Sequence, residues 1–422
     1  MKNLLFALTG VLVFFACSDD EGTPPPELTE NIITYEPSIM QQDHLVLVIE
    51  NGQTASYLVN KEGERKFTWD FPRKLGNDMN LLDDGRVLAI FKSDDPTIMF
   101  GGWGGVTGLV DKESNITWEY EVNTTHEIAH HDVEMLPSGN VLIMIWEKID
   151  MAEAQAAGAK VTTDIVVEKL IEVNPANDEI VWQWRSWDHI IQDKDDGFPN
   201  FGSVSDNPQL LDINYINEAN GDIMHANGID YDAANDVIYL SVNFWHEVWA
   251  IDHSTTTQEA AGSTGGNFGK GGDIIYRFGN PLAYQNTQGT VLFDRNHHPN
   301  LIPSGHPGAG NMIIYVNGNS VLQSTIYELD IPDILSLTPN ADNEPAVVWS
   351  YTDPELFSGR TSGVVRQSNG NTLICESDYG YWEVTPDGEI AWQYTELVDP
   401  FFWRGYSIDH DHPAVEALGI TL

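Results

Sequence analysis

The chain has 422 residues, 41% of them hydrophobic and 10% aromatic, so it can bury a large core and is not disordered as a whole. Its 64 Asp and Glu residues against 20 Lys and Arg give a formal net charge of −44. This charge argues against nucleic acid as a partner and against a basic patch that binds an anionic bilayer.

The first residues resemble a bacterial lipoprotein signal. An apolar run over 4–16 is too short to span a bilayer and ends at Cys17. We predict a signal peptide at 1–16 and lipidation of Cys17, with Phe14 in the lipobox place usually held by Leu. An ordinary secretory signal with an incidental Cys is the alternative. Lipidation predicts a cell-envelope protein, facing the periplasm or exposed on the outer membrane, that touches the membrane only through its anchor.

Residues 17–40 are predicted to form a tether before a folded domain at 41–422. This stretch is acidic and contains the run Thr23-Pro24-Pro25-Pro26-Glu27, a composition that stays extended and solvated. The only other cysteine, Cys375, lies in an apolar run and is predicted to be a buried core residue.

One phrase recurs six times along the chain: an apolar run, a turn rich in Asp, Asn or Gly, and an aromatic pair. Each copy alternates apolar and polar residues around its turn, which predicts a β-hairpin. The aromatic pairs are Phe67 and Trp69, Trp118 and Tyr120, Trp182 and Trp184, Tyr276 and Phe278, Trp349 and Tyr351, and Trp392 and Tyr394.

A second hairpin phrase precedes most copies, as at 82–88, 136–142 and 367–373. Two hairpins make one four-stranded antiparallel sheet, so the sequence predicts an all-β, six-bladed β-propeller. The first blade has the weakest signal, with 44–50 as its early strand. A parallel β-solenoid is the structural alternative.

Histidines recur at one position of the repeat. His130 and His131, His225, and His297 stand five or six residues before the turn phrases of the third, fourth and fifth blades, and His298 directly follows His297. The innermost strands of a propeller surround a central channel, so these side chains are expected to converge in one polar pocket. The repeat alone leaves two chemistries open, which are metal binding and acid–base or nucleophilic catalysis.

Several segments resemble the bacterial arylsulfotransferase family. They are His130-His131-Asp132-Val133, 182–193, 208–214, 225–231, 276–281 and 370–376, spread over about residues 75–415. The resemblance implies a six-bladed propeller that moves a sulfuryl group from an aryl sulfate to a phenol without a cofactor. It also implies a sulfohistidine intermediate.

The resemblance implies a role for several residues. His297 matches the nucleophile, and the helper histidines match His225 and His130 or His131. Asn227, Asn243 and His298 are the expected substrate-binding residues. The family has an arginine where this chain has Asn243, which leaves open whether activity is retained. The residues that could supply the missing charge are Arg277, Arg295, Arg360 and Arg404.

Two hypotheses from other functional classes remain open. One is a cell-surface propeller that binds a glycan or an aromatic ligand without catalysis. The other is a metalloenzyme that uses the ring of histidines. Neither the oligomeric state nor the identity of donor and acceptor follows from the sequence.

Overall fold

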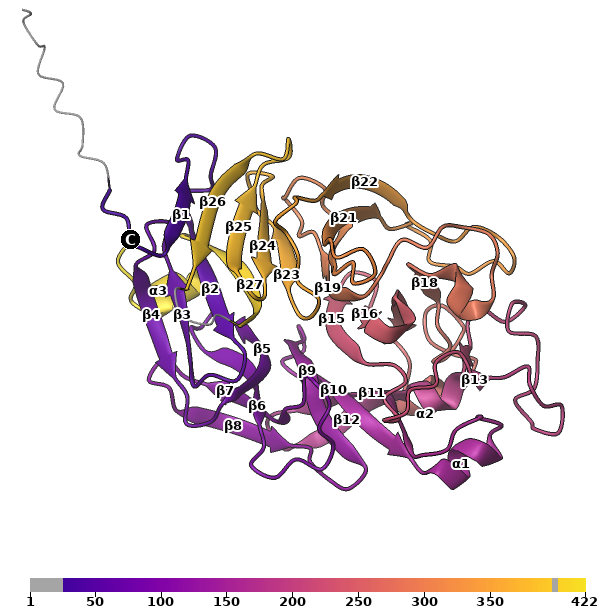
Figure 1. The fold of residues 1–422 in the computed structure, drawn as a ribbon. Coiled ribbons are helices and arrows are strands. Elements are labelled where there is room, and N and C mark those ends of the chain that lie inside the picture. Colours follow the sequence, from indigo (N-terminus) through magenta and orange to yellow (C-terminus); the bar gives the residue numbers. More distant parts are fainter. Residues whose placement is uncertain (1–25, 397–400) are drawn as a thin grey trace, which may run out of the picture.

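Six antiparallel blades surround a central channel in the computed structural model, which describes residues 26–396 and 401–422 (Figure 1). Five blades have four strands and the sixth has five. The predicted all-β, six-bladed propeller is therefore confirmed. The predicted signal peptide and Cys17 lie outside the described residues, so the lipid anchor stays a prediction from sequence.

The blades follow one another along the chain, and the strands of each blade run from the axis outward. Blade one contains, in that order, β27 (Phe402–Asp409), β2 (His44–Glu50), β3 (Ala55–Val59) and β4 (Arg65–Asp70). Blade two contains β5 (Leu75–Leu81), β6 (Val87–Lys92), β7 (Gly105–Val110) and β8 (Ile116–Glu121). Blade three contains β9 (Glu127–Met135), β10 (Val141–Ile149), β11 (Ile165–Asn174) and β12 (Glu179–Arg185).

The second half of the ring repeats this plan. Blade four contains β15 (Ala226–Asp232), β16 (Val237–Val242), β17 (Glu247–Asp252) and β18 (Tyr276–Phe278). Blade five contains β19 (Asn296–Leu301), β20 (Met312–Val316), β21 (Thr325–Asp330) and β22 (Ala346–Tyr351). Blade six contains β23 (Gly363–Arg366), β24 (Thr372–Glu376), β25 (Gly380–Val384), β26 (Ile390–Thr395) and, outermost, β1 (Ile32–Tyr35).

The two ends of the chain meet in blade one and close the ring. The predicted early strand, β2, is second from the axis, and the C-terminal strand β27 pairs with it as the innermost strand. The six innermost strands then contact one another in the cyclic order β5, β9, β15, β19, β23 and β27. The repeat phrases do not reveal β27, because its partners are about 360 residues away in sequence.

The predicted tether is too long at its C-terminal end. Ile32–Tyr35 form β1, which pairs with β26 and covers the outer edge of blade six. The folded domain therefore begins before residue 41. An exposed strand edge favours pairing, and β1 satisfies the free backbone groups of β26.

Apolar side chains fill the spaces between all neighbouring blades. On β2, Leu45, Leu47 and Ile49 pack toward blade two, whereas Val46 and Val48 pack toward blade six. Successive side chains of a strand point to opposite faces, so a strand between two sheets is apolar at every position. Cys375 is buried in the cluster between blades one and six, as the sequence predicts.

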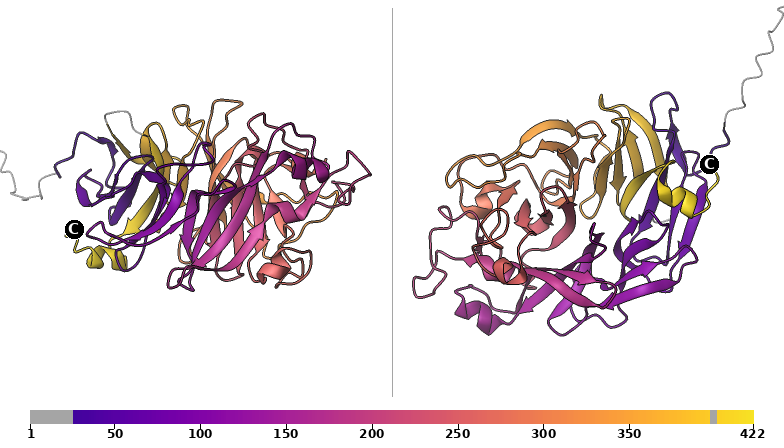
Figure 2. Two further views of the ribbon diagram at one scale, coloured as in Figure 1. Left: turned by 90° about the horizontal axis from the view of Figure 1, so that it is seen from below. Right: turned by 180° about the vertical axis from the view of Figure 1, so that it is seen from behind.

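Short elements occur in the loops between strands, between blades and after the last strand (Figure 2). The helical ones are α1 (Met151–Ala156), η1 (Ser186–His189), η2 (Asn243–Trp245), α2 (Thr257–Ala260), η3 (Pro281–Tyr284) and α3 (Pro413–Ala417). β13 (Ile190–Ile191) and β14 (Leu211–Asp212) form a small parallel pair. In the part of the chain that the structure describes, no helix combines the length and apolarity needed to cross a bilayer.

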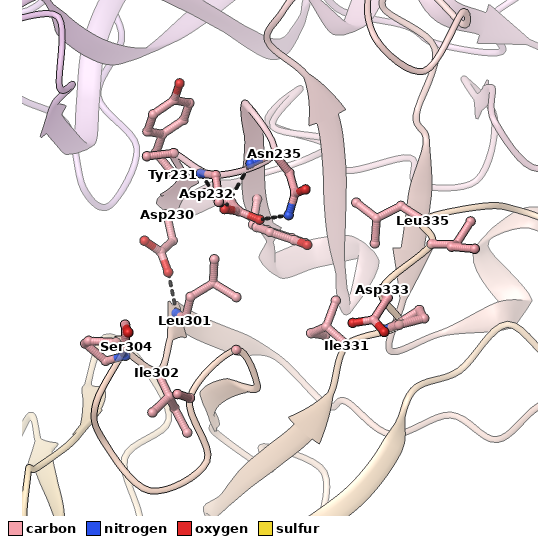
Figure 3. Close-up of a pocket in the computed structure, with 18 of the residues that line it drawn as sticks. Asp230, Tyr231, Asp232, Asn235, Leu301, Ile302, Ser304, Ile331, Asp333 and Leu335 are labelled. Atoms are coloured by element: carbon pink, nitrogen blue, oxygen red, sulfur yellow. Dashed lines mark hydrogen bonds between the residues drawn. The ribbon is translucent and has the colours of Figure 1, made fainter.

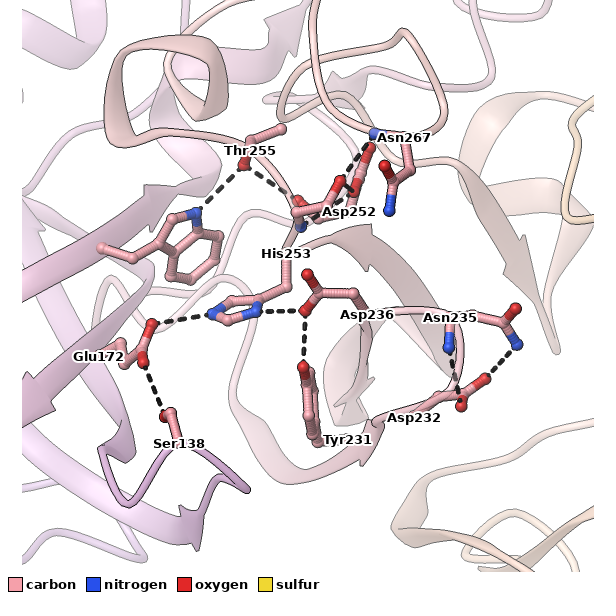
Figure 4. Close-up of polar contacts among 12 residues, drawn as sticks. Ser138, Glu172, Tyr231, Asp232, Asn235, Asp236, Asp252, His253, Thr255 and Asn267 are labelled. Atoms are coloured by element: carbon pink, nitrogen blue, oxygen red, sulfur yellow. Dashed lines mark hydrogen bonds and ion pairs between the residues drawn. The ribbon is translucent and has the colours of Figure 1, made fainter.

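His253, just after β17, joins blade four to blade three (Figure 4). Its Nδ1 lies 2.7 Å from Oδ1 of Asp236, and its Nε2 lies 3.1 Å from Oε2 of Glu172 on β11. Tyr231 donates a further hydrogen bond to Asp236. Burial alone would lower the pKa of His253, but the hydrogen bonds with Glu172 and Asp236 outweigh burial and raise it. A protonated His253 therefore donates to carboxylates on both blades.

We expect His253→Gln to lower the free energy of unfolding by roughly 1–3 kcal/mol near pH 6, the range for hydrogen bonds to charged groups. The pKa of His253 is higher in the folded state than in the unfolded state, so the stabilisation that its proton provides is complete below the unfolded pKa of about 6.5. This stabilisation is lost as the pH rises through the folded pKa. Urea unfolding at several pH values measures the difference. His126→Gln, at an exposed position, is the control, and a deficit that does not shrink toward about pH 9 contradicts the charged state of His253.

Candidate functional site

The innermost strands share one irregularity. Their pairing with the next strand is interrupted in β5, β9, β15, β19 and β27. Positive φ angles occur at His131, His225 and His298, in or just before three of these strands, and at Thr361, just before the regular strand β23. A bulge turns a side chain away from the regular alternation of a strand, and non-glycine residues rarely adopt positive φ. The irregularities therefore mark a level of the channel where side chains are aimed inward.

A cavity of about 610 Å³ opens at this level, and we call it the mouth cavity. His131 on β9, His225 just before β15 and His297 on β19 all line it, so three sheets each contribute an imidazole. The ring centroids of His131 and His225 are 5.0 Å apart. The ring of Trp403 lies 5.6 Å from that of His131 and 6.3 Å from that of His297. Three of the five histidines singled out by the repeat thus meet in one cavity.

Of the adjacent pair on β9, His131 faces the cavity and His130 lies behind it. His130 is fully buried, stacks on Trp146 at 4.2 Å between centroids, and has its Nδ1 2.8 Å from Nδ1 of His131. Its Nε2 lies 3.0 Å from Oε2 of Glu168. Burial lowers the pKa of both histidines well below the usual value, and the nearby His225 adds to this. His130 is therefore a neutral support for His131.

The imidazole of His297 has one nitrogen held by the protein and one free. Its Nδ1 lies 2.7 Å from Oδ1 of Asn317. The Nδ2 of Asn317 donates to the carbonyls of Ser358 and Thr361, at 2.8 and 3.1 Å, which turns its oxygen toward His297. The network therefore assigns the proton to Nδ1 and leaves the lone pair on Nε2. Burial lowers the pKa of His297 to about 3, against the opposing effect of the Asn317 hydrogen bond. The ring is neutral at pH 7.

His225 forms a dyad with a carboxylate. Its Nδ1 lies 2.5 Å from Oδ2 of Asp222, and its ring stacks on Phe244 with 4.7 Å between centroids. Asp222 is 2% exposed, so the contact is shielded from water. The carboxylate orients the imidazole and keeps the Nδ1 proton in place, so Nε2 can give or take a proton.

Arg295, just before β19, reaches the place where the resemblance expects an arginine. Its Nη1 donates to Oδ1 of Asn243 at 3.1 Å, and its guanidinium carbon lies 4.3 Å from the centroid of Phe244. Arg360 lines the same cavity but is 66% exposed, and Arg277 is buried in blade four outside it. Among the arginines that the sequence offers, Arg295 is the one that contacts Asn243.

Asn243 and Asn227 hold the strand that carries His297. Their side-chain amides donate to the carbonyl of Asn296, at 3.1 and 2.8 Å. Asn243 lines the mouth cavity, whereas Asn227 is fully buried and does not. Asn227, expected from the resemblance to bind substrate, therefore lies behind the cavity wall.

His298 faces the opposite end of the channel. It lines a separate cavity of about 210 Å³ together with Asp78, Asp132 and Asp230. Its Nδ1 accepts a hydrogen bond from the backbone N–H of Val364 at 3.0 Å. The structure thus separates His298 from His297, although the two are adjacent in sequence, because the pairing of β19 shifts between His297 and Asn300 and His298 has a positive φ angle.

Arg404 lies on the axis between the two ends of the channel. Its Nη1 lies 2.7 Å from Oδ2 of Asp132 and 3.5 Å from Oδ2 of Asp78, and its Nη2 donates to the carbonyl of Asn227 at 2.8 Å. Burial and the neighbouring Asp132 raise the pKa of Asp78 to about 8, and Arg404 opposes this rise. One buried guanidinium therefore ties blade one to blades two, three and four.

Sequence reasoning missed three residues of this site, Asp222, Asn317 and Trp403, and it named Arg404 only as one of four arginines that could supply charge. Asp222 precedes His225 by three residues, so its spacing offers a local signal. Asn317 follows β20 and comes beside His297 only through the pairing of β20 with β19. Trp403 and Arg404 lie on β27, whose position depends on ring closure.

The mouth cavity is cationic although the chain is strongly acidic. Lys92, Arg295 and Arg360 line it, and no described Asp or Glu does. Its aromatic lining consists of Phe100, Trp103, Phe244, Phe401 and Trp403. Cations and aromatic faces together suit an anionic group attached to an aromatic ring. Within residues 26–396 and 401–422, no group of three or more His, Cys, Asp or Glu side chains could hold a metal ion.

A cavity of about 710 Å³ lies elsewhere, between blades four and five (Figure 3). It lies at the ends of β15 and β19 that are remote from the mouth cavity, where Asp230 accepts a hydrogen bond from the backbone of Leu301. Ile331 and Leu335 contribute apolar surface, and no imidazole lines it. The mouth cavity is therefore the candidate active site.

The family model described as Arylsulfotransferase (ASST) matches residues 33–398. Among solved structures, a protein of unknown function from Bacteroides caccae is 10% identical, with 87% of this chain and 99% of that chain covered and a TM-score of 0.49. A putative 6-phosphogluconolactonase from Bacteroides fragilis is 11% identical, with coverage of 89% and 100% and a TM-score of 0.44. A comparison with curated proteins gives no significant match.

We expect Asn317→Asp to raise the pKa of His297 from about 3 by roughly 1–3 units, because a carboxylate beside Nδ1 favours the imidazolium. Histidine NMR signals followed through a pH titration measure the change. Asn319→Asp introduces the same charge two positions away in the same cavity and should shift the pKa far less. Equal shifts in the two variants contradict the direct contact.

Proposed function

Because the chain belongs to the arylsulfotransferase family, we propose that it transfers a sulfuryl group from an aryl sulfate to a phenol, with His297 as the nucleophile. One observation carries the proposal. The neutral His297, whose Nδ1 proton is held by Asn317, lines a cavity of cations and aromatic rings that no described carboxylate enters. A neutral imidazole with a free Nε2 lone pair is a competent nucleophile.

In the first half-reaction, the Nε2 lone pair of His297 forms a bond to sulfur while the bond from sulfur to the aryl oxygen breaks. The protonated His225 gives its Nε2 proton to the departing phenolate. The product is a sulfohistidine whose ring carries a positive charge. The Asn317 oxygen, 2.7 Å from Nδ1, stabilises that charge as a hydrogen-bond acceptor.

The second half-reaction reverses these roles. A phenol enters, gives its proton to Nε2 of His225, and attacks sulfur with its oxygen. The nitrogen–sulfur bond breaks and His297 returns to its neutral form, so protons and charge balance over the cycle. Asp222, 2.5 Å from Nδ1, stabilises His225 in the state in which it carries both protons.

Arg295 supplies the charge that the sulfuryl oxygens require. A guanidinium presents several N–H donors in a rigid plane, and the contact with Asn243 orients that plane within the cavity. In this proposal, Asn243 together with Arg295 replaces the single family arginine. His131 also lines the cavity, with its Nε2 close to Gly102, where a side chain would clash.

We expect His297→Ala to abolish release of p-nitrophenol from p-nitrophenyl sulfate in the presence of phenol, with a loss of at least about 10³-fold. Mass spectrometry of wild-type protein mixed with donor alone should find one added sulfuryl group, absent from the variant. His126→Ala, an exposed histidine outside the cavity, is the control. Turnover unaffected by His297→Ala discards the nucleophile, and no turnover by the wild type leaves only a ligand-binding propeller.

We expect Arg295→Met to lower kcat/KM for p-nitrophenyl sulfate by about 10²–10³-fold, the usual cost of losing one donor to a developing oxyanion. Arg295→Lys should recover part of this loss, because it restores the charge without the planar geometry. Arg86→Met, on an exposed turn, should retain full activity. Full activity in Arg295→Met would show that another group binds the sulfuryl oxygens.

A further inference from the structure

A second cavity adjoins the mouth cavity and is also cationic. It has a volume of about 740 Å³ and lies between blades one and two, and we call it the side groove. The side groove and the mouth cavity share Lys92 and Trp103. Arg73 and Lys74 bring two further positive charges to the side groove, against the single described carboxylate of Asp94. Lys92 and Trp103 therefore lie at the boundary between the two cavities.

Lys92, the last residue of β6, presents an ammonium group that no described residue neutralises. Its Nζ lies 4.7 Å from the centroid of the Trp103 ring, and no described side chain or carbonyl forms a hydrogen bond or ion pair with it. Burial lowers the pKa of Lys92, and Lys74 adds to this effect. The backbone N–H of Lys92 donates to the carbonyl of Lys74 at 2.9 Å, which keeps the two residues together.

The neighbouring cations are also weakly paired. Arg73 lies 3.9 Å from Asp94 and 3.7 Å from Glu119, and both carboxylates are largely exposed. Such long, exposed pairs contribute little. Five of the chain's 20 Lys and Arg residues line the two cavities, although the chain has 64 acidic residues. This concentration of positive charge indicates that the site accommodates more than one negative charge.

The proposed reaction places only one negative charge in the site, that of the sulfuryl group. The sulfuryl group must lie beside His297 and Arg295, in the mouth cavity, in both half-reactions. Lys92 therefore faces the aryl part of the substrate, next to the aromatic surface of Trp103. Resting on the proposed function, we infer that the side groove binds an acidic substituent on the aryl ring, so the preferred substrates are phenols that carry a carboxylate. Lys92 forms the ion pair with that carboxylate, and Lys74 adds to the favourable field.

A pair of acceptors of similar shape tests this inference. With p-nitrophenyl sulfate as the donor, kcat/KM is measured for p-hydroxyphenylacetate and for its neutral amide. The wild type should prefer the acid by about two- to fivefold, the effect of one partly exposed ion pair. Lys92→Gln should bring the ratio of acid to amide close to one. Lys270→Gln, the same change in an exposed loop of blade four, should keep the wild-type ratio.

The outcomes distinguish a failure of the side-groove proposal from a failure of the proposed sulfotransferase function. Turnover of both acceptors without a preference for the acid, or a preference that survives Lys92→Gln, overturns the side groove and leaves the sulfotransferase intact. If neither acceptor is sulfated, the proposed function fails, and calorimetric titration with the acid and the amide decides the groove by itself. If the wild type binds the acid more tightly than the amide and Lys92→Gln removes this difference, the result supports the side groove. Equal binding of the two compounds by the wild type overturns the side groove.

Discussion

The pairing of β27 with β2 is the constraint on which the rest of the molecule depends. It joins the last strand of the chain to the first blade and completes the circle of innermost strands. The same strand carries Trp403 into the mouth cavity and Arg404 onto the axis. Arg404 then bonds to Asp132 and to the carbonyl of Asn227, so the closing strand also fixes the relative positions of blades three and four. A buried guanidinium needs such partners, because an unpaired charge in this environment is strongly destabilising.

Closure also divides the channel into two ends of opposite chemistry. The mouth cavity has cations and aromatic rings, and the opposite cavity has the carboxyl groups of Asp78, Asp132 and Asp230. Arg404 lies between them and compensates the acidic end. A chain with a net charge of −44 repels an anion at long range, so under the proposed function the local positive field at the mouth would favour entry of an aryl sulfate.

Neutral amides do much of the positioning around His297. Asn317 orients the imidazole, and Asn243 and Asn227 hold the backbone beside it at Asn296. A carboxylate in the place of Asn317 would favour the imidazolium and consume the lone pair that the chemistry needs. Amides supply the same geometry without added charge. In the proposed function, the charge for the sulfuryl oxygens would come from Arg295, whose guanidinium donates to Asn243.

The architecture followed from the sequence because it rests on local, repeated patterns. Turn residues and alternating apolar side chains define each hairpin, and the six copies of the phrase led to six blades. Equal repeat positions also brought His131, His225 and His297 to one mouth of the channel. Two strands near the ends of the chain could not be predicted in this way. β1 and β27 pair with strands far away in sequence, and no local signal records such partners.

The sequence by itself determined the fold class, the number of blades and the convergence of three imidazoles, since each of these depends on short-range periodicity. Only the tertiary structure decided which side chain of each adjacent pair faces the cavity. His131 and His297 face the mouth cavity, whereas His130 and His298 lie outside it, because bulges in the innermost strands reset the direction of each side chain. The contacts that Asn317, Asp222, Arg295 and Arg404 make were likewise decided only by the packing of the blades, because hydrogen bonds and ion pairs depend on distances that sequence separation does not encode.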